Sequence, residues 1–294
     1  MLVGHGTIRS SVMGMDPRNP TPEELGKMRS ILHQAMKEGA WGMSTGLEYV
    51  PGRYANTEEL IEITKVINEF GGIYSTHKRT EQALVREAVK EVIQIATEAN
   101  VRADISHLKI CGKTHWGLMK DVVKLINDAR AEGIYIVADM YPYDKASSGP
   151  LTSFIGIPKN MEPLPKIKKK LRAQNLSDAE KKKLKAQFDD ELIKGLTDPS
   201  KRKEIREATV VGSSNHPSPI ATWGWDSFPI VSAKKNTHLI GKILYDLARE
   251  QNRDAFDIVA DLFIEEQDNI HLSTGAMSED EMKLAMRNDW LMFS

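Results

Sequence analysis

Apolar residues recur along the first half of the chain with two alternating spacings. In some segments they return every three or four residues, the period of an α-helix with one buried face. This spacing predicts helices over 22–37, 56–70, 81–99 and 117–131. Between them lie short apolar runs bounded by glycine, asparagine or polar residues. These runs predict buried strands over 2–5, 40–45, 73–77, 103–107 and 134–140.

Strands that alternate with long amphipathic helices are typical of an α/β protein with a parallel sheet. Each strand–helix unit takes roughly 30–40 residues, which suits a barrel or an open, doubly wound sheet. The sequence has no internal repeat and no low-complexity linker, so we predict a single domain over 1–294.

A lysine-rich segment follows, at about 160–205, in which acidic residues are interspersed. Ser177 and Glu180 have the spacing of a capping box, which predicts a helix that starts there. We interpret the segment as a solvated surface helix in preference to a nucleic-acid or membrane-binding element.

Composition narrows the class of protein. The chain has 40 Lys and Arg against 41 Asp and Glu, so it lacks the basic surplus that phosphate binding needs. With 40% hydrophobic and 28% charged residues it is globular, and no apolar run reaches the length of a membrane span. The single cysteine and the absence of a secretory signal at the start predict a cytoplasmic protein. The charge balance and the lack of a membrane span predict that it has no nucleic-acid or membrane partner.

Polar side chains stand at the carboxyl end of each predicted strand. They are His5, Ser44 with Thr45, His77, His107 with Lys109, and Asp139 with Tyr141. In a parallel α/β array these ends meet at one rim, where such folds carry their chemistry.

The strongest pair at this rim is His77 and His107, which end consecutive strands. Adjacent parallel strands are about 4.8 Å apart, so two imidazoles there can reach one zinc ion. The alternative is that the two histidines bind no metal and only form hydrogen bonds at the rim. Zinc prefers three or four ligands, and this pair supplies two. Cys111 is a weaker candidate for a third ligand than for a plain buried thiol.

For the other polar residues at the rim, both a role in ligand binding and a purely structural role agree with the sequence. Lys109 can meet an anionic substrate group or start a surface loop. Tyr141, Tyr143 and Ser147 can donate hydrogen bonds to a ligand or line the rim.

Five segments together resemble the N-acyl-D-amino-acid deacylases (D-aminoacylases) of the amidohydrolase superfamily. They are 3–9, 42–52, 75–81, 106–109 and 139–143, in matching order and spacing. The resemblance implies a distorted (β/α)8 TIM-type barrel with zinc and a small β-sandwich. It implies that His77 on strand 5 and His107 on strand 6 bind zinc. It also implies that four residues line the substrate pocket: Tyr49, Lys109, Tyr141 and Ser147.

The reaction implied by this resemblance is zinc-dependent hydrolysis of the amide bond of N-acyl-D-amino acids, which yields a carboxylate and a free D-amino acid. The family's remaining histidines and bridging cysteine precede Met1, and its general-base aspartate follows Ser294. We therefore expect strands 3–7 without strands 1, 2, 8 and the sandwich, a helical insertion at about 160–205, and no catalytic base. Such a chain is expected to bind zinc weakly, to turn over little, and to self-associate through open barrel edges.

Two alternatives differ in class. A cyclic-amide hydrolase of the dihydroorotase or hydantoinase type usually bridges two metals through a lysine on strand 4, where this chain has Ser44, Thr45 and Gly46. A non-catalytic scaffold or partner-binding remnant agrees with the missing base and ligands, but it does not explain the pair His77 and His107.

Overall fold

A computed structural model describes residues 1–171, 176–213, 216–275 and 277–294. The chain forms two compact units, of which the first comprises Met1–Asp144 and Met277–Ser294, and the second the residues between. Each unit is described by itself, and the single domain over 1–294 stays a prediction.

The first unit is built on a six-stranded parallel sheet. Its strands, in spatial order, are β1 (Leu2–Gly4), β2 (Gly42–Gly46), β3 (Ile73–His77), β4 (Arg102–Ile105), β5 (Ile136–Met140) and β11 (Leu291–Phe293). The predicted α/β fold with its five parallel strands is confirmed. The sixth strand, β11, was not predicted, and it extends the sheet past β5, where strand 8 was expected to be missing. It has only three residues, too few for a periodic signal.

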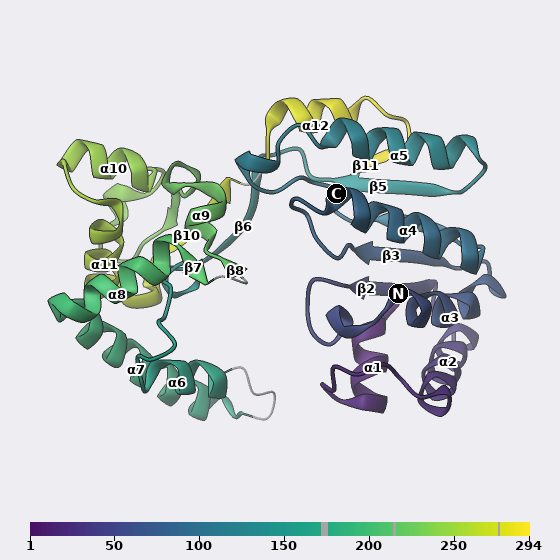
Figure 1. Cartoon of the computed structure of the whole chain (residues 1–294), viewed down its shortest axis with the longest axis horizontal. Helices are drawn as coiled ribbons and strands as arrows, with labels where there is room; N and C mark the ends of the chain where they lie inside the picture. Colours follow the sequence, from purple (N-terminus) through teal and green to yellow (C-terminus); the bar gives the residue numbers. More distant parts are fainter. Residues whose placement is uncertain (172–175, 214–215, 276) are drawn as a thin grey trace. The chain divides into compact units, whose positions relative to one another are not determined.

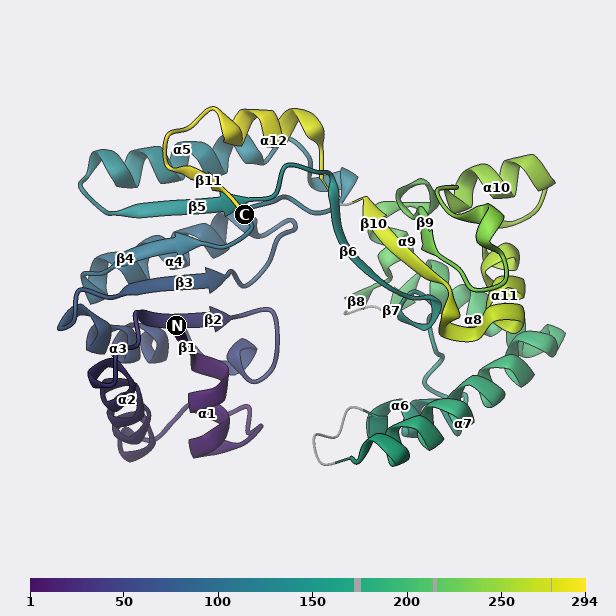
Figure 2. The same cartoon turned by 180° about the vertical axis from the view of Figure 1, so that it is seen from behind.

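Helices connect the strands of this unit and lie against one face of the sheet, in front in Figure 1 and behind it in Figure 2. They are α1 (His5–Met13), α2 (Pro22–Lys37), α3 (Thr57–Asn68), α4 (Val85–Ala99), α5 (Met119–Ala131) and α12 (Glu279–Met286), with 3-10 turns η1 (Gly52–Tyr54) and η2 (Lys113–His115). The start of α2 is the predicted one, because the Thr21 hydroxyl accepts from the Glu24 amide in a capping box.

The second unit packs helices around a small antiparallel sheet. Its strands β6 (Lys145–Pro150), β10 (His271–Gly275) and β9 (Ile230–Ser232) pair in that order, and β7 (Gly212–Ser213) pairs with β8 (His216–Pro217). The helices are α6 (Leu164–Leu171), α7 (Asp178–Thr197), α8 (Pro199–Val210), α9 (Pro219–Trp223), α10 (Leu244–Gln251) and α11 (Ala255–Glu266), with 3-10 turns η3 (Leu151–Ser153), η4 (Trp225–Ser227), η5 (Thr237–Leu239) and η6 (Gln267–Asn269).

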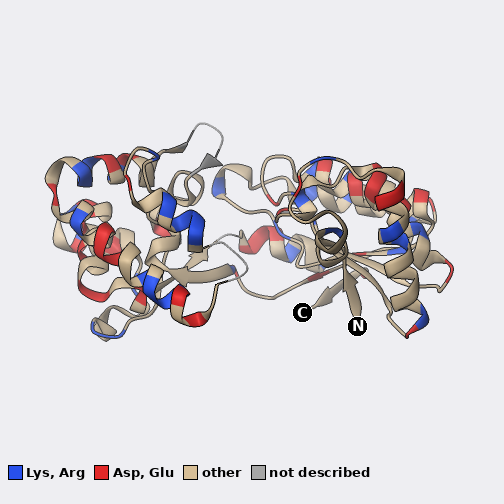
Figure 3. Cartoon of the chain, turned by 90° about the horizontal axis from the view of Figure 1, so that it is seen from below, with Lys and Arg blue, Asp and Glu red and all other residues tan. Residues whose placement is uncertain are grey.

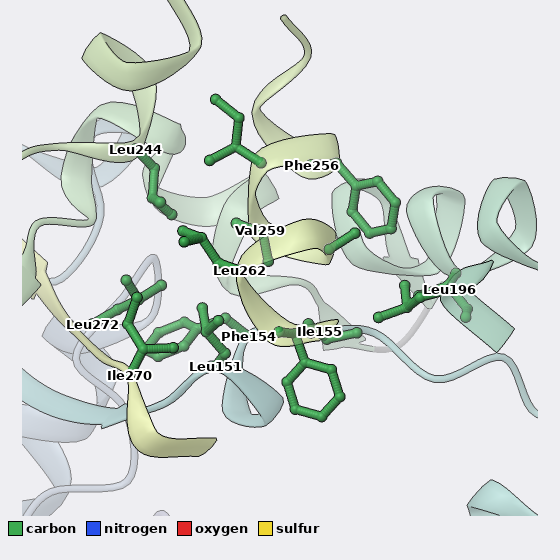
Figure 4. Close-up of a cluster of buried hydrophobic side chains, with 14 of the residues drawn as sticks. Leu151, Phe154, Ile155, Leu196, Leu244, Phe256, Val259, Leu262, Ile270 and Leu272 are labelled. Atoms are coloured by element: carbon green, nitrogen blue, oxygen red, sulfur yellow. The ribbon is translucent and has the colours of Figure 1, made fainter. Parts of the chain in front are cut away.

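An apolar core holds this second unit together (Figure 4). It contains Leu151, Phe154, Phe256 and Leu262 among its buried side chains. The lysine-rich segment is helical, and α7 begins after Ser177, whose hydroxyl accepts from the Glu180 amide as predicted. Both charge signs occur along the helices (Figure 3). None of the described helices is long and apolar enough to cross a membrane.

Candidate metal centre

Two histidines face one another at the ends of neighbouring strands. His77 is the last residue of β3, and His107 follows β4, which pairs with β3 in parallel. The Nδ1 atom of His77 lies 3.0 Å from the Nε2 atom of His107, and the ring centroids are 4.7 Å apart. The structure thus brings together the pair that the sequence singled out, and each ring turns one nitrogen toward the other.

The backbone of His107 has an unusual conformation that an aspartate holds in place. Its φ is +39°, in the left-handed region that few residues other than glycine adopt. The amide of His107 donates to Oδ1 of Asp139 at 2.8 Å, and the next amide, of Leu108, donates to the Asp139 carbonyl at 2.7 Å. Asp139 therefore acts on the direction of the His107 ring through the backbone.

We predict that Asp139→Ala lowers the free energy of unfolding by about 1–3 kcal/mol, because a charge-assisted hydrogen bond to a strained turn is lost. Asp139→Asn keeps an acceptor oxygen in the same place and is the matched variant, with a smaller expected loss. Urea unfolding followed by circular dichroism measures both. An Asp139→Ala protein with the wild-type midpoint contradicts this role.

Glu81 adds a carboxylate to the pair. One oxygen, Oε1, lies 3.3 Å from Nδ1 of His107, 2.9 Å from Nζ of Lys109 and 3.2 Å from Nζ of Lys78. His77, Glu81 and His107 each offer one ligand atom, and these atoms lie within 4.8 Å of one another. Two imidazole nitrogens with a carboxylate oxygen are a donor set that zinc accepts in proteins.

Glu81 was not predicted as a ligand, because its position was assigned to the start of a helix. The helix α4 begins at Val85, so Glu81 lies in the preceding loop, where its side chain is free to turn toward the histidines. The available signal was its position four residues after His77, at the end of one of the five matching segments.

One buried carboxylate in this cluster, that of Glu81, faces two ammonium groups, those of Lys78 and Lys109. Burial alone would raise the pKa of Glu81, but Lys78, His107 and Lys109 together hold this pKa well below its usual range. Burial lowers the pKa of Lys78, whose side chain is fully enclosed. Burial also raises the pKa of Cys111 to about 12, so at neutral pH it is a protonated thiol that donates to Glu81.

Three of the predicted pocket residues gather around the two histidines. The ring of Tyr49 lies 4.9 Å from that of His77. The ammonium of Lys109 lies 2.8 Å from Nδ1 of His107 and 5.5 Å from the ring centre of Tyr141. The buried hydroxyl of Tyr141 has no hydrogen-bond partner among the described residues, and burial raises its pKa.

Ser147 belongs to the second unit. It lies in β6, and its hydroxyl is 3.3 Å from that of Thr274 in β10. Its assignment to the substrate pocket, like the roles of the other pocket residues and of the two histidine ligands, stays a prediction.

The first unit thus combines a parallel α/β sheet with a histidine pair at adjacent strand ends. No protein-family model matches the chain. The D-aminoacylase of Alcaligenes xylosoxydans xylosoxydans is 39% identical to it over 147 residues, and the N-acyl-D-aspartate deacylase of that organism is 34% identical over 148 residues. Each match covers 50% of this chain and 30% of the relative. Half of the chain is thus homologous to N-acyl-D-amino-acid deacylases, which confirms the resemblance carried by the motifs.

Solved structures show the same fold over the whole chain. The N-acyl-D-glutamate deacylase from Bordetella bronchiseptica, complexed with zinc and a phosphonate inhibitor, aligns with a TM-score of 0.59 at 24% identity. A crystal structure of D-aminoacylase aligns with a TM-score of 0.58 at 24% identity. Both alignments cover 100% of this chain, but only 47% and 46% of the solved chains.

Proposed function

We propose that His77, His107 and Glu81 bind zinc, and that this centre serves the hydrolysis of the amide bond of N-acyl-D-amino acids. The observation that carries the proposal is the pair of facing nitrogens, 3.0 Å apart, on adjacent strand ends. The named relatives act on N-acyl-D-amino acids, and their homology to half of the chain supports the same substrate class.

Zinc, when bound, supplies Lewis-acid polarisation of the amide carbonyl and a water of lowered pKa. The protein's own groups bind and orient the substrate. The Lys109 ammonium and the unpartnered Tyr141 hydroxyl are the donors that suit its carboxylate. Glu81 is ionised because of the lysines beside it, and it compensates positive charge in the centre.

This chain alone is proposed to be impaired in turnover. It spans about 30% of the length of the curated relatives that it matches. The family resemblance assigns further metal ligands and the general base to segments that this sequence does not contain. We also propose a cytoplasmic location, supported by the single cysteine, and self-association through β1 and β11, the two edges of the sheet.

The test is hydrolysis of N-acetyl-D-amino acids with zinc present, with the L-enantiomers as controls. The chain is assayed alone and after it is joined to the segments that flank the matching region in a related deacylase. We expect selective cleavage of the D-substrates by the joined protein and little or none by the chain alone. A joined protein that folds and holds zinc but cleaves no N-acyl substrate contradicts the proposed reaction.

A further inference from the structure

We propose that Glu48 is a positioning residue of the metal centre: it holds the proton of His77 on Nε2 and so keeps Nδ1 free to bind the metal ion. The inference rests on the proposed metal site. No role of Glu48 was predicted from the sequence, and Glu48 lies outside the group of described side chains able to hold the ion, which is His77, Glu81 and His107.

The first support is the contact between the two side chains. Oε2 of Glu48 lies 2.8 Å from Nε2 of His77, the nitrogen that points away from His107. An ionised carboxylate only accepts hydrogen bonds, so Nε2 must carry the proton in this contact. A neutral imidazole has a single N–H, and Nδ1 therefore presents its lone pair toward His107.

The second support is that the contact between Lys109 and His107 agrees with the same tautomer of His77. If Nδ1 of His77 accepts, Nε2 of His107 must donate across the 3.0 Å between the rings. Nδ1 of His107 is then an acceptor, and the group beside it at 2.8 Å is the Lys109 ammonium, which can only donate. The Lys109 ammonium also donates to Oε1 of Glu81, at 2.9 Å, and this oxygen lies 3.3 Å from Nδ1 of His107. Donors and acceptors are thus consistent from Lys109 to Glu48 when Lys109, and not His107, supplies the proton to Glu81. Metal binding at Nε2 of His107 would require the proton on that nitrogen to move to Nδ1 of the same ring, which lies 3.3 Å from Oε1 of Glu81.

The third support is the backbone that carries Glu48 to this place. Glu48 follows β2, in which Gly46 is in register with His77, and the amide of Leu47 donates to the His77 carbonyl at 3.0 Å. A side chain at Gly52 would put its Cβ 2.7 Å from the Gly46 carbonyl oxygen, so glycine permits the turn to close there. Main-chain contacts therefore hold the turn that carries Glu48 against the end of β3, where His77 lies.

The exposure of the Glu48 side chain allows its effect on His77 to be tested without disturbing the packing of the core. The Glu48 side chain is 45% exposed and that of His77 is 14% exposed. Carboxylates that accept from the outer nitrogen of a metal-bound histidine fix its tautomer and ring orientation, and their loss typically weakens metal binding about 10–100-fold. Truncation of an exposed side chain removes this effect without leaving a cavity in the core.

The experiment compares Glu48→Ala and Glu48→Gln with Glu69→Ala in the full chain. Glu69 is the matched control, because it lies 3.8 Å from another histidine, His33, at an exposed position. Zinc affinity is measured by competition with a chelator, and the His77 tautomer by nitrogen NMR of the metal-free protein. We expect about 10–100-fold weaker zinc binding in Glu48→Ala, a smaller loss in Glu48→Gln, whose amide oxygen still accepts, and no change in Glu69→Ala.

The NMR measurement supports the inference if His77 carries its proton on Nε2 in the wild type and if part of the Glu48→Ala protein carries it on Nδ1. Wild-type zinc affinity and an unchanged tautomer in Glu48→Ala overturn it. In the His77→Ala background, Glu48→Ala should cause no further loss of affinity, and an equal second loss also overturns it. If the wild type binds no zinc, the proposed function fails, while the tautomer still decides the role of Glu48.

Discussion

Zinc binding is expected to weaken sharply when either histidine of the facing pair is replaced by alanine. The centre offers three candidate ligands, so the loss of one imidazole should weaken zinc binding on the order of 100-fold or more. His77→Ala and His107→Ala should lose the metal to a similar degree, because each ring supplies one of the two nitrogens that face one another.

Metal content after dialysis against a fixed chelator concentration measures this effect. His33→Ala is the matched control, since His33 is a partly exposed histidine of α2 whose nearest acidic partner is Glu69, at 3.8 Å. The control should keep the wild-type metal content. Equal metal content in His77→Ala, His107→Ala and the wild type would place the metal elsewhere and remove the basis of the proposed function.

A second large effect is expected from Gly42→Ala, which should lower the free energy of unfolding by more than about 4 kcal/mol or prevent folding of the first unit. A Cβ at this position would lie 1.9 Å from the carbonyl oxygen of Ile73 and 2.8 Å from its nitrogen. These are backbone atoms of β3, in register with Gly42 of β2. Neither strand can yield without breaking the ladder that carries His77.

Gly26→Ala is the matched control for this substitution. Gly26 lies on the exposed side of α2, and a Cβ there meets nothing within 4 Å. Alanine should stabilise the helix by about 0.4–1 kcal/mol. Urea unfolding followed by circular dichroism and by tryptophan fluorescence compares the two variants. A Gly42→Ala protein as stable as the wild type contradicts the close approach of β2 and β3.

Local patterns in the sequence predicted those elements whose signals lie within a few residues. Helix α2 was predicted to its ends because a capping box, a proline and a regular apolar face all occur inside one short window. Strand β3 was also predicted to its ends, because a short run that follows two glycines marks it within a few residues. The strand β11 was missed because its pairing with β5 joins residues about 150 positions apart, and a three-residue run has no period of its own.

The sequence by itself determined the alternation of strands and helices and the placement of His77 and His107 at consecutive strand ends. Only the tertiary structure decided that Glu81 and Glu48 turn toward these histidines and that Asp139 holds His107 at a positive φ. The physical reason is range: periodicity and capping are interactions between near neighbours. A contact between a loop carboxylate and an imidazole some 30 residues away exists only after the strands have paired.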